Sequence, residues 1–236
     1  MKQIFVVLVC LPLLATAQKN IVKINASSLA LKNFSFQYER EVGLKSTLSL
    51  GIRFMPKSGL PFQSTAEDVF NFDDDVNVGR FKTGNFAITP EYRFYLGRKN
   101  MRGFYIAPYA RYATFNITLP VKYSSGGTRR DADFTGNIQS FSGGVMAGTQ
   151  YTFGGKFVLD IWILGGHCGA SNGNLNSVTS PPLTATEQSS LRETLEDFDP
   201  SPFKYSYSVN ANGAQIKANG PWAGIRGAGI NLGIRF

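Results

Sequence analysis

The sequence predicts an all-β protein, an eight-stranded antiparallel up-and-down transmembrane β-barrel with long extracellular loops. The first observation is composition: of 236 residues only 17% are charged and 43% are hydrophobic, with 25 glycines. Such a chain is neither disordered nor a charge-rich helical bundle, and it has no apolar run long enough for a membrane-spanning helix. The second observation is a set of segments in which apolar and polar residues alternate. The third is a last segment that ends on an aromatic residue, Phe236.

Residues 1–17 have the features of a secretory signal peptide. A basic residue precedes the apolar run 4–14, and residues 15–17 (ATA) place small side chains where signal peptidase requires them. A short buried N-terminal strand is the alternative, but the order of basic start, apolar core and small-residue exit favours a signal. We expect its removal, which leaves one outer-membrane domain over residues 18–236.

The charge and the cysteines of the mature chain limit its partners and its stabilisation. The full chain has a formal net charge of +8. In an exported protein this excess favours anionic lipid head groups, so we expect outer-membrane lipid as a partner and no nucleic acid. Only Cys168 remains after the signal is removed, so no intrachain disulfide can form.

Eight segments alternate with a period of two, as β-strands with one apolar face do. They lie at residues 22–26, 34–39, 48–54, 86–96, 104–112, 140–153, 157–163 and 228–236. The apolar face has no charged residue, and the other face is mostly Gly, Ser, Ala, Thr, Asn and Gln with sparse charge. Aromatic residues recur near the segment ends, as in the girdles of membrane barrels. We therefore expect the apolar face to point outward into lipid and the polar face to fill a crowded interior.

Six charged residues of the polar face are candidates for a network in that interior. The two sets balance three against three: Glu39, Glu91 and Asp160 against Arg53, Arg93 and Arg111. Charges that are excluded from water persist only when they are paired and hydrogen-bonded. An eight-stranded barrel is also just narrow enough for side chains to fill it. We therefore predict a closed polar network, and a pure pore is the weaker interpretation.

Connection lengths give the expected orientation. Short connections lie at residues 40–45, 97–103 and 154–156, and long ones at 56–84, 120–133 and 169–220. Membrane barrels keep short turns in the periplasm and long loops outside. Counting backwards from Phe236 then requires the first segment to be a full strand with a tight outer turn at residues 31–33.

The longest of these loops has signals of its own. Thr184 and Glu187 have the spacing of a helix capping box, and an apolar stripe follows, so we expect a short amphipathic helix over 185–197. The stripe consists of Leu191, Leu195 and Phe198. Residues 205–209 and 214–218 flank a turn and predict a hairpin whose arms are shorter than the roughly 9 to 11 residues needed to cross a membrane. We expect that hairpin outside the barrel, with ten strands as the alternative.

Four stretches carry a resemblance to a known family. They are ITPEYRFYL (88–96), GFYIAPYARY (103–112), LDIWILGGH (159–167) and GPWAGIRGAGINLGIRF (220–236). The chain resembles the small uncharacterised outer-membrane β-barrel family of Bacteroidota, and more distantly OmpX and the membrane domain of OmpA. The resemblance implies an eight-stranded barrel in the outer membrane with no assigned activity, catalytic residue, cofactor or metal. The terminal Phe236, with apolar residues two, four and six positions before it, resembles the signal that the barrel-assembly machinery recognises.

The function predicted from these observations is non-enzymatic. We expect the loops to act in envelope maintenance, surface interaction or stress response, and to meet an extracellular ligand that the sequence does not identify. The alternative is an outer-membrane acyl transferase or hydrolase that uses His167 at the extracellular rim, with Ser171, Cys168 or a loop aspartate as its partner.

Metal sites are not expected. His167 and Cys168 are adjacent and no other imidazole or thiol remains in the mature chain to complete a zinc site. An acidic cluster, Glu67 and Asp68 with residues 73–75, lacks the alternating spacing of a calcium loop, so we interpret it as a solvated loop.

Overall fold

The computed structural model describes residues 19–59, 78–98, 101–197 and 202–236. These residues form nine antiparallel strands: β1 (Asn20–Asn25), β2 (Phe34–Gly43), β3 (Ser46–Gly59), β4 (Lys82–Tyr95), β5 (Gly103–Ser125), β6 (Thr128–Phe153), β7 (Phe157–Val178), β8 (Lys204–Asn210) and β9 (Gly213–Arg235). Three short helical elements accompany them: α1 (Ala26–Leu29), η1 (Val78–Arg80) and α3 (Ala185–Asp197). The predicted signal peptide and the acidic cluster lie outside the described residues.

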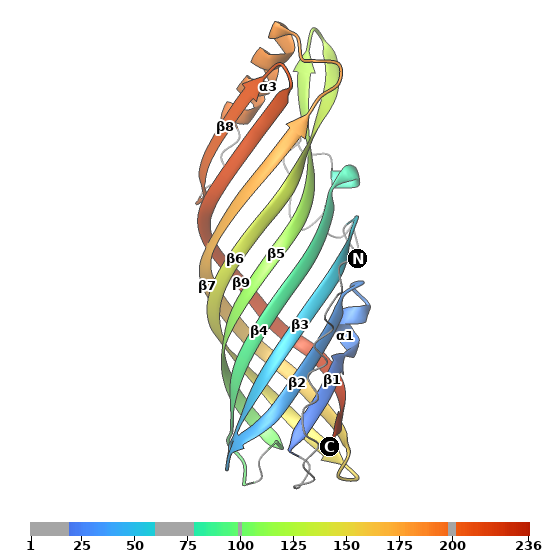
Figure 1. Cartoon of the computed structure of the whole chain (residues 1–236), viewed down its shortest axis with the longest axis vertical. Helices are drawn as coiled ribbons and strands as arrows, with labels where there is room; N and C mark the ends of the chain where they lie inside the picture. Colours follow the sequence, from blue (N-terminus) through green and yellow to red (C-terminus); the bar gives the residue numbers. More distant parts are fainter. Residues whose placement is uncertain (1–18, 60–77, 99–100, 198–201) are drawn as a thin grey trace, which may run out of the picture.

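The strands form one sheet that closes into a ring. Each strand from β1 to β6 pairs with the next along the chain, β7 pairs with β9, and β9 returns to pair with β1. Among the described residues β8 pairs with β9 alone, beside the upper part of that strand. The strands are inclined to the long axis of the molecule and the C-terminus lies at the lower end (Figure 1).

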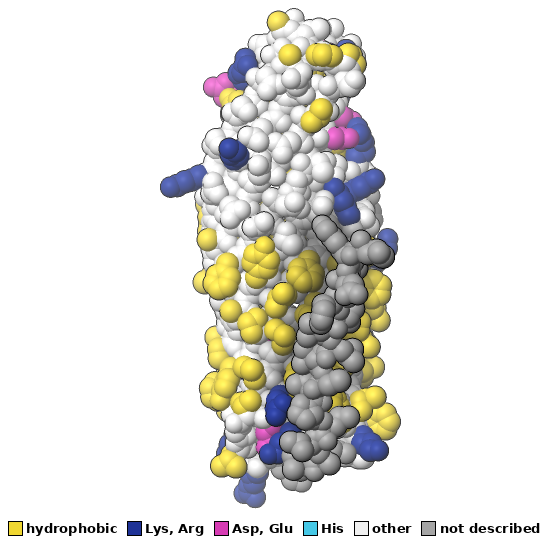
Figure 2. Space-filling model, viewed as in Figure 1, with side chains coloured by type: hydrophobic (Ala, Val, Ile, Leu, Met, Phe, Trp, Pro, Cys, Tyr) yellow, Lys and Arg dark blue, Asp and Glu magenta, His cyan; other side chains and the backbone are white. Residues whose placement is uncertain are grey.

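The predicted alternation holds in the lower half of the ring: the apolar residues point outward and the polar residues inward. On β1, Val22 and Ile24 are exposed while Lys23 between them is buried. On β3, Leu48 and Leu50 are exposed while Ser49 is buried. A wide band of hydrophobic side chains therefore covers the outside of the lower half, and the visible surface above it has few (Figure 2).

The lower band has a defined height on each strand. On β6 the exposed large hydrophobic residues run from Phe141 to Phe153, and on β9 from Ile225 to Ile234. Of the exposed large hydrophobic residues described on β5, β6, β7, β8 and β9, Val178 alone lies in the upper parts of these strands. Separately, none of the described helices is long and apolar enough to cross a membrane.

The upper half of the molecule corrects two loop expectations. Residues 120–133, expected as a loop, are the top of a long hairpin in which β5 and β6 pair as far as Ser125 and Thr128. Residues 169–220 are also partly strand, because β7 extends to Val178 and β9 begins at Gly213. The Gly-rich and Asn-rich sequence of these parts hides their strand character, since it lacks the outward apolar residues of the lower band.

The predicted helix is confirmed as α3, with the predicted bounds. The Thr184 hydroxyl accepts from the Glu187 backbone N–H at 3.3 Å, and the Glu187 carboxylate accepts from the Thr184 backbone N–H at 2.8 Å. Leu191 and Leu195 of the apolar stripe are buried, and Phe198 lies outside the described residues. They pack into a core with residues of four long strands: Val121, Tyr123, Ala132, Phe134, Leu175, Ala214 and Ile216.

The predicted hairpin at 205–218 is present, but its second arm is the top of β9 and not a separate strand. The first strand is also shorter than expected. It ends at Asn25, whose side-chain oxygen accepts from the Ser28 backbone N–H at 2.8 Å and so starts α1. A turn at the expected place follows, and β2 begins at Phe34.

An irregularity in β7 and β9 changes which residues of these two strands face the interior. On the β6–β7 ladder Gly148 pairs with Trp162 and Ala147 with Leu164, so that Ile163 is left between the two pairs. On the neighbouring strand β9, Ala228 is likewise left between two pairs, and its φ is 52°. Above this level the inward parity changes, because a β-bulge re-aims the side chains that follow it. His167 and Arg226 face inward for this reason.

Candidate functional site

The lower interior is built around an ion network whose centre is Lys23. Its Nζ donates to Glu39 Oε2 at 2.5 Å, to Gln150 Oε1 at 2.6 Å and to Asp160 Oδ2 at 2.7 Å. Arg93 donates from Nη1 to the same Asp160 oxygen at 2.8 Å. The side chains of Lys23, Glu39, Arg93 and Asp160 are fully buried. These charges come from four strands, so the network ties opposite sides of the ring together.

Neutral side chains satisfy the remaining lone pairs of the two carboxylates. Tyr95 Oη and Thr47 Oγ1 donate to Glu39 Oε1 at 2.6 and 2.7 Å. Tyr105 Oη donates to Asp160 Oδ1 at 2.7 Å. A buried ion network holds its geometry when every member is hydrogen-bonded. The network therefore forms a fixed polar plug across the lower interior.

Glu91 extends the plug upward. Its Oε2 accepts from Arg93 Nη2 at 2.9 Å, and its Oε1 forms an ion pair with Arg226 Nη1 at 2.5 Å. The plug thus contains three cations, Lys23, Arg93 and Arg226, and three anions, Glu39, Glu91 and Asp160. Its formal charge is zero.

The structure brings four of the six predicted network residues together and leaves two outside. Arg53 Nε donates to Asn85 Oδ1 at 2.9 Å, and Arg111 Nη1 donates to Thr89 Oγ1 at 3.3 Å. Both acceptors are neutral, and neither arginine forms an ion pair within the part of the chain described here. The predicted balance of three against three is present, but Lys23 and Arg226 take the places expected for these two arginines.

Sequence reasoning missed Lys23 and Arg226 for different reasons. Lys23 lies on the polar parity of the first segment, so its inward direction was readable, but its partners come from strands far away in the sequence. Arg226 lies above the bulge at Ala228, where continued alternation would place it outward. The glycines around it, Gly224 and Gly227, were the available sign of irregular strand geometry.

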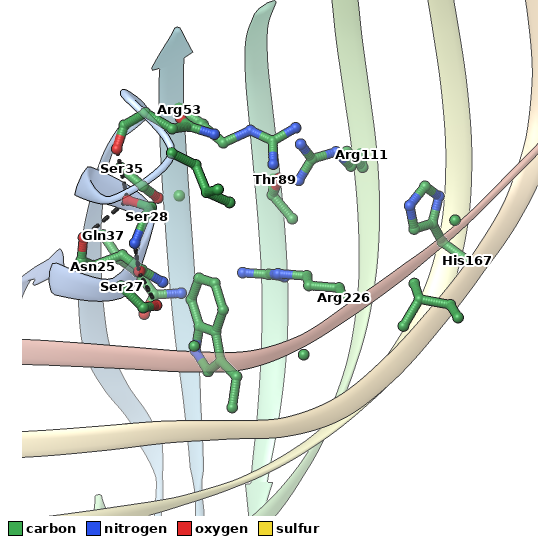
Figure 3. Close-up of a pocket in the computed structure, with 18 of the residues that line it drawn as sticks. Asn25, Ser27, Ser28, Ser35, Gln37, Arg53, Thr89, Arg111, His167 and Arg226 are labelled. Atoms are coloured by element: carbon green, nitrogen blue, oxygen red, sulfur yellow. Dashed lines mark hydrogen bonds between the residues drawn. The ribbon is translucent and has the colours of Figure 1, made fainter. Parts of the chain in front are cut away.

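Above the plug lies a pocket of about 500 Å³. Its walls include the three arginines Arg53, Arg111 and Arg226, together with His167 and both tryptophans of the chain, Trp162 and Trp222. Figure 3 shows the Arg53 and Arg111 side chains pointing toward each other from different strands, with Arg226 below them and His167 to the right. Arg226 lies over the Trp162 ring, with 4.1 Å from Cζ to the centroid. The lining is therefore basic and aromatic.

His167 is placed differently from the expectation. It lies near the middle of β7 and lines the pocket, so the prediction that it ends a strand at the rim is wrong. Its ring meets Tyr109 edge-on with centroids 6.1 Å apart, and its buried Nδ1 has no hydrogen-bond partner among the described residues. Its charged neighbours in the pocket are the three arginines, none of which can serve as the acidic group that orients a catalytic base.

Two of the suggested partners of His167 are described. Cys168 is exposed, and Ser171 Oγ donates to the Gly220 carbonyl at 3.4 Å. The aspartates of the first long loop lie outside the described residues. No group of three or more His, Cys, Asp or Glu side chains that could hold a metal occurs within the described ranges.

Two comparisons with known proteins give one match. A family model described as "Protein of unknown function (DUF3575)" matches residues 3–180. No curated protein matches the sequence. The matched range contains the pocket residues of β2 to β7. It also contains every residue of the plug except Arg226.

Proposed function

The chain belongs to the DUF3575 family of proteins of unknown function, and we propose that it is an integral outer-membrane protein. The ring of β1 to β7 and β9 is then an eight-stranded transmembrane β-barrel, and β8 is an addition outside the bilayer. Lipid surrounds the lower band, and the upper parts of β5 to β9 project outward with α3. Its role is non-enzymatic, in envelope maintenance, surface interaction or stress response.

The observation that carries this proposal is the outward apolar band. Apart from Val178, the exposed Phe, Leu, Ile and Val side chains on the strands of the ring lie in the same lower half. On β9 they run from Ile225 to Ile234, which matches the roughly 9 to 11 residues that a tilted strand needs. In water such a surface would be an aggregation hazard, because soluble proteins rarely expose so large an apolar area. Charges are inside this part of the ring and hydrophobic residues outside, the reverse of a soluble fold.

The partners follow from the same geometry. Outer-membrane lipid covers the band, and the barrel-assembly machinery engages the last strand through Phe236, which is exposed next to Ile234. The projecting core around α3 has a compact interior of its own and presents a surface to an extracellular ligand.

A pair of matched variants tests this proposal in cells. Leu50→Arg places a charge in the band, and Val178→Arg places the same charge on the exposed upper part of β7. A cation on the lipid face near the bilayer centre costs about 2–4 kcal/mol, whereas one outside the bilayer costs little. We expect Leu50→Arg to lower the amount of heat-modifiable protein in the outer membrane, and Val178→Arg to leave it unchanged. Recovery of the native protein from the soluble periplasmic fraction, or equal behaviour of the two variants, would contradict the proposal.

A further inference from the structure

Among the residues that the structure describes, the wall of the ring is incomplete beside β9. On the side of β9 that faces β1 and β2, the β1 ladder begins at Asn231 and the β8 ladder covers Gly213–Asn219. Between these ladders residues 220–230 have no strand partner on that side within the described ranges. The helical turn α1 lies beside the lower end of this stretch, where Ser27 Oγ accepts from the Ile230 backbone N–H at 3.1 Å.

The pocket opens through this break. Besides the inward-facing arginines, its lining includes three residues whose side chains are exposed on the outer surface: Leu31, Phe36 and Ile225. Leu31 and Phe36 lie on the α1 and β2 side of the break, and Ile225 lies on β9. Among the described residues, the lining of the pocket therefore reaches from the basic interior to the apolar outer surface.

The interior end of this space has an excess of positive charge. Arg226 is neutralised by Glu91, but Arg53 and Arg111 have only neutral acceptors among the described residues. Two more donors lie in the lining without a hydrogen-bond partner there: Trp162 Nε1 and, in the tautomer that carries its proton on Nδ1, His167. Guanidinium groups are the preferred partners of carboxylate and phosphate groups, and burial strengthens such pairs.

The height of the basic groups matches the upper border of the apolar band. Arg53 precedes Phe54, which pairs with Phe86, and Arg111 precedes Tyr112, which pairs with Phe141. The exposed hydrophobic residues of β3 end at Phe54, and on β6 the band begins at Phe141. An anionic group held by the two arginines would thus lie level with the border, with apolar surface below it.

We propose that this pocket binds an anionic amphiphile. Its carboxylate or phosphate head group binds Arg53 and Arg111, and its hydrocarbon chain leaves through the break along Leu31, Phe36 and Ile225. A volume of about 500 Å³ is within the range of small-molecule sites. The direction of the ligand's hydrocarbon chain rests on the proposed membrane location. The positive charge of the pocket and its position at the break do not depend on that proposal.

The two tryptophans provide a direct assay, since both line the pocket and the chain has no other. Bromine quenches indole fluorescence on contact, so we would titrate the folded mature protein in micelles with 9,10-dibromostearic acid. The matched neutral probe is its methyl ester. We expect saturable quenching by the acid and only gradual, unsaturable quenching by the ester. A Trp222→Phe variant isolates the signal of Trp162, which is buried and lines the pocket.

Variants of the arginines test the head-group site. Arg53→Gln and Arg111→Gln, singly and together, should weaken binding of the acid by at least about tenfold, as expected when a charge-assisted hydrogen bond is lost. The control is Arg40→Gln, which removes an exposed cation at the lower end of the ring and should leave binding unchanged. Folding of each variant is checked by heat-modifiable migration.

Several outcomes would overturn the inference. They are equal quenching by acid and ester, unchanged binding in the double variant, and displacement of the acid by inorganic phosphate alone, which would indicate a site for free anions. A dibromo-lysophosphatidic acid in place of the fatty acid distinguishes a phosphate from a carboxylate head group. If the protein proves soluble, the titration is repeated in buffer below the micelle concentration. In that case the proposed function is wrong, and the titration still shows whether the pocket binds an anionic amphiphile.

Discussion

The Arg226 guanidinium forms an ion pair with the buried carboxylate of Glu91, with Nη1 and Oε1 2.5 Å apart. The same guanidinium lies over the rings of Trp162 and Tyr109, at 4.1 and 5.1 Å from their centroids. This pair is the junction between the neutral plug below and the basic pocket above. It neutralises the third arginine of the pocket, whereas Arg53 and Arg111 form no ion pair with any residue that the structure describes.

Removing one partner of this pair should destabilise the protein more than removing both. Glu91→Gln leaves a buried guanidinium without its counter-charge, and such a change costs about 3–5 kcal/mol of unfolding free energy. The double variant Glu91→Gln, Arg226→Gln should recover part of that loss, because no unpaired Arg226 remains. The measurement is urea unfolding in lipid vesicles, followed by tryptophan fluorescence. A double variant that loses the full sum of the two single losses would show that the groups do not interact.

The plug should prevent ion flow through the ring. Lys23, Glu39, Arg93, Tyr95, Tyr105 and Asp160 fill the lower interior and are essentially inaccessible to solvent. We expect the purified protein to show no steady conductance in planar bilayers. Lys23→Ala, which removes the central cation and its side-chain volume, is the variant in which openings should appear. Steady conductance of the unmodified protein would show that a continuous channel exists.

The N-terminus of α3 should loosen in acid. The Thr184 backbone N–H and hydroxyl donate to the Glu187 carboxylate and hold its pKa below the usual 4.5, and Arg130 adds a favourable charge. Because the folded pKa is the lower one, the contribution to stability is present above about pH 4.5 and is lost as the pH falls through the folded value. The protection factors of the first turn of α3 against hydrogen exchange, corrected for the intrinsic pH dependence of amide exchange, should therefore fall on acidification. In Glu187→Gln they should already be low at neutral pH, and an unchanged acid response in that variant would refute the assignment.

The enzyme alternative depends on His167, because the chain has no other histidine. We expect His167→Ala to change neither the lipid composition of the membrane nor the cleavage of surface peptides. A native protein that modifies lipid or peptide, with a folded His167→Ala variant that is about 100-fold less active, would establish the enzyme instead, since general acid–base catalysis contributes that much.

The lower ring was predictable because alternation is a local signal. Residues such as Leu48, Ser49 and Leu50 report the direction of each side chain without knowledge of the neighbouring strand. The capping pair Thr184 and Glu187 likewise located α3 from adjacent residues. Both signals lie within a few residues of the structure that they determine.

The rest depends on relationships between distant residues. The bulge at Ile163 and Ala228 changes the inward parity and brings His167 and Arg226 into the interior, which simple alternation cannot reveal. The early end of β1 at Asn25 leaves residues 220–230 of β9 without a described strand partner on the β1 side, and no pattern in β9 itself indicates this. The pocket therefore could not be predicted, although Arg53 and Arg111 were correctly placed in the interior.

The central claim, that lipid surrounds the lower band, is tested most directly by spin labels on the outer surface. In a Cys168→Ser background, single cysteines replace Val145 within the band and Val178 above it, two positions that are both exposed. The labelled protein is reconstituted in vesicles, and relaxation by oxygen is compared with relaxation by a water-soluble nickel chelate. We predict that oxygen relaxes the label at position 145 more strongly and the nickel chelate the label at position 178. Strong relaxation of both labels by the nickel chelate would contradict the account.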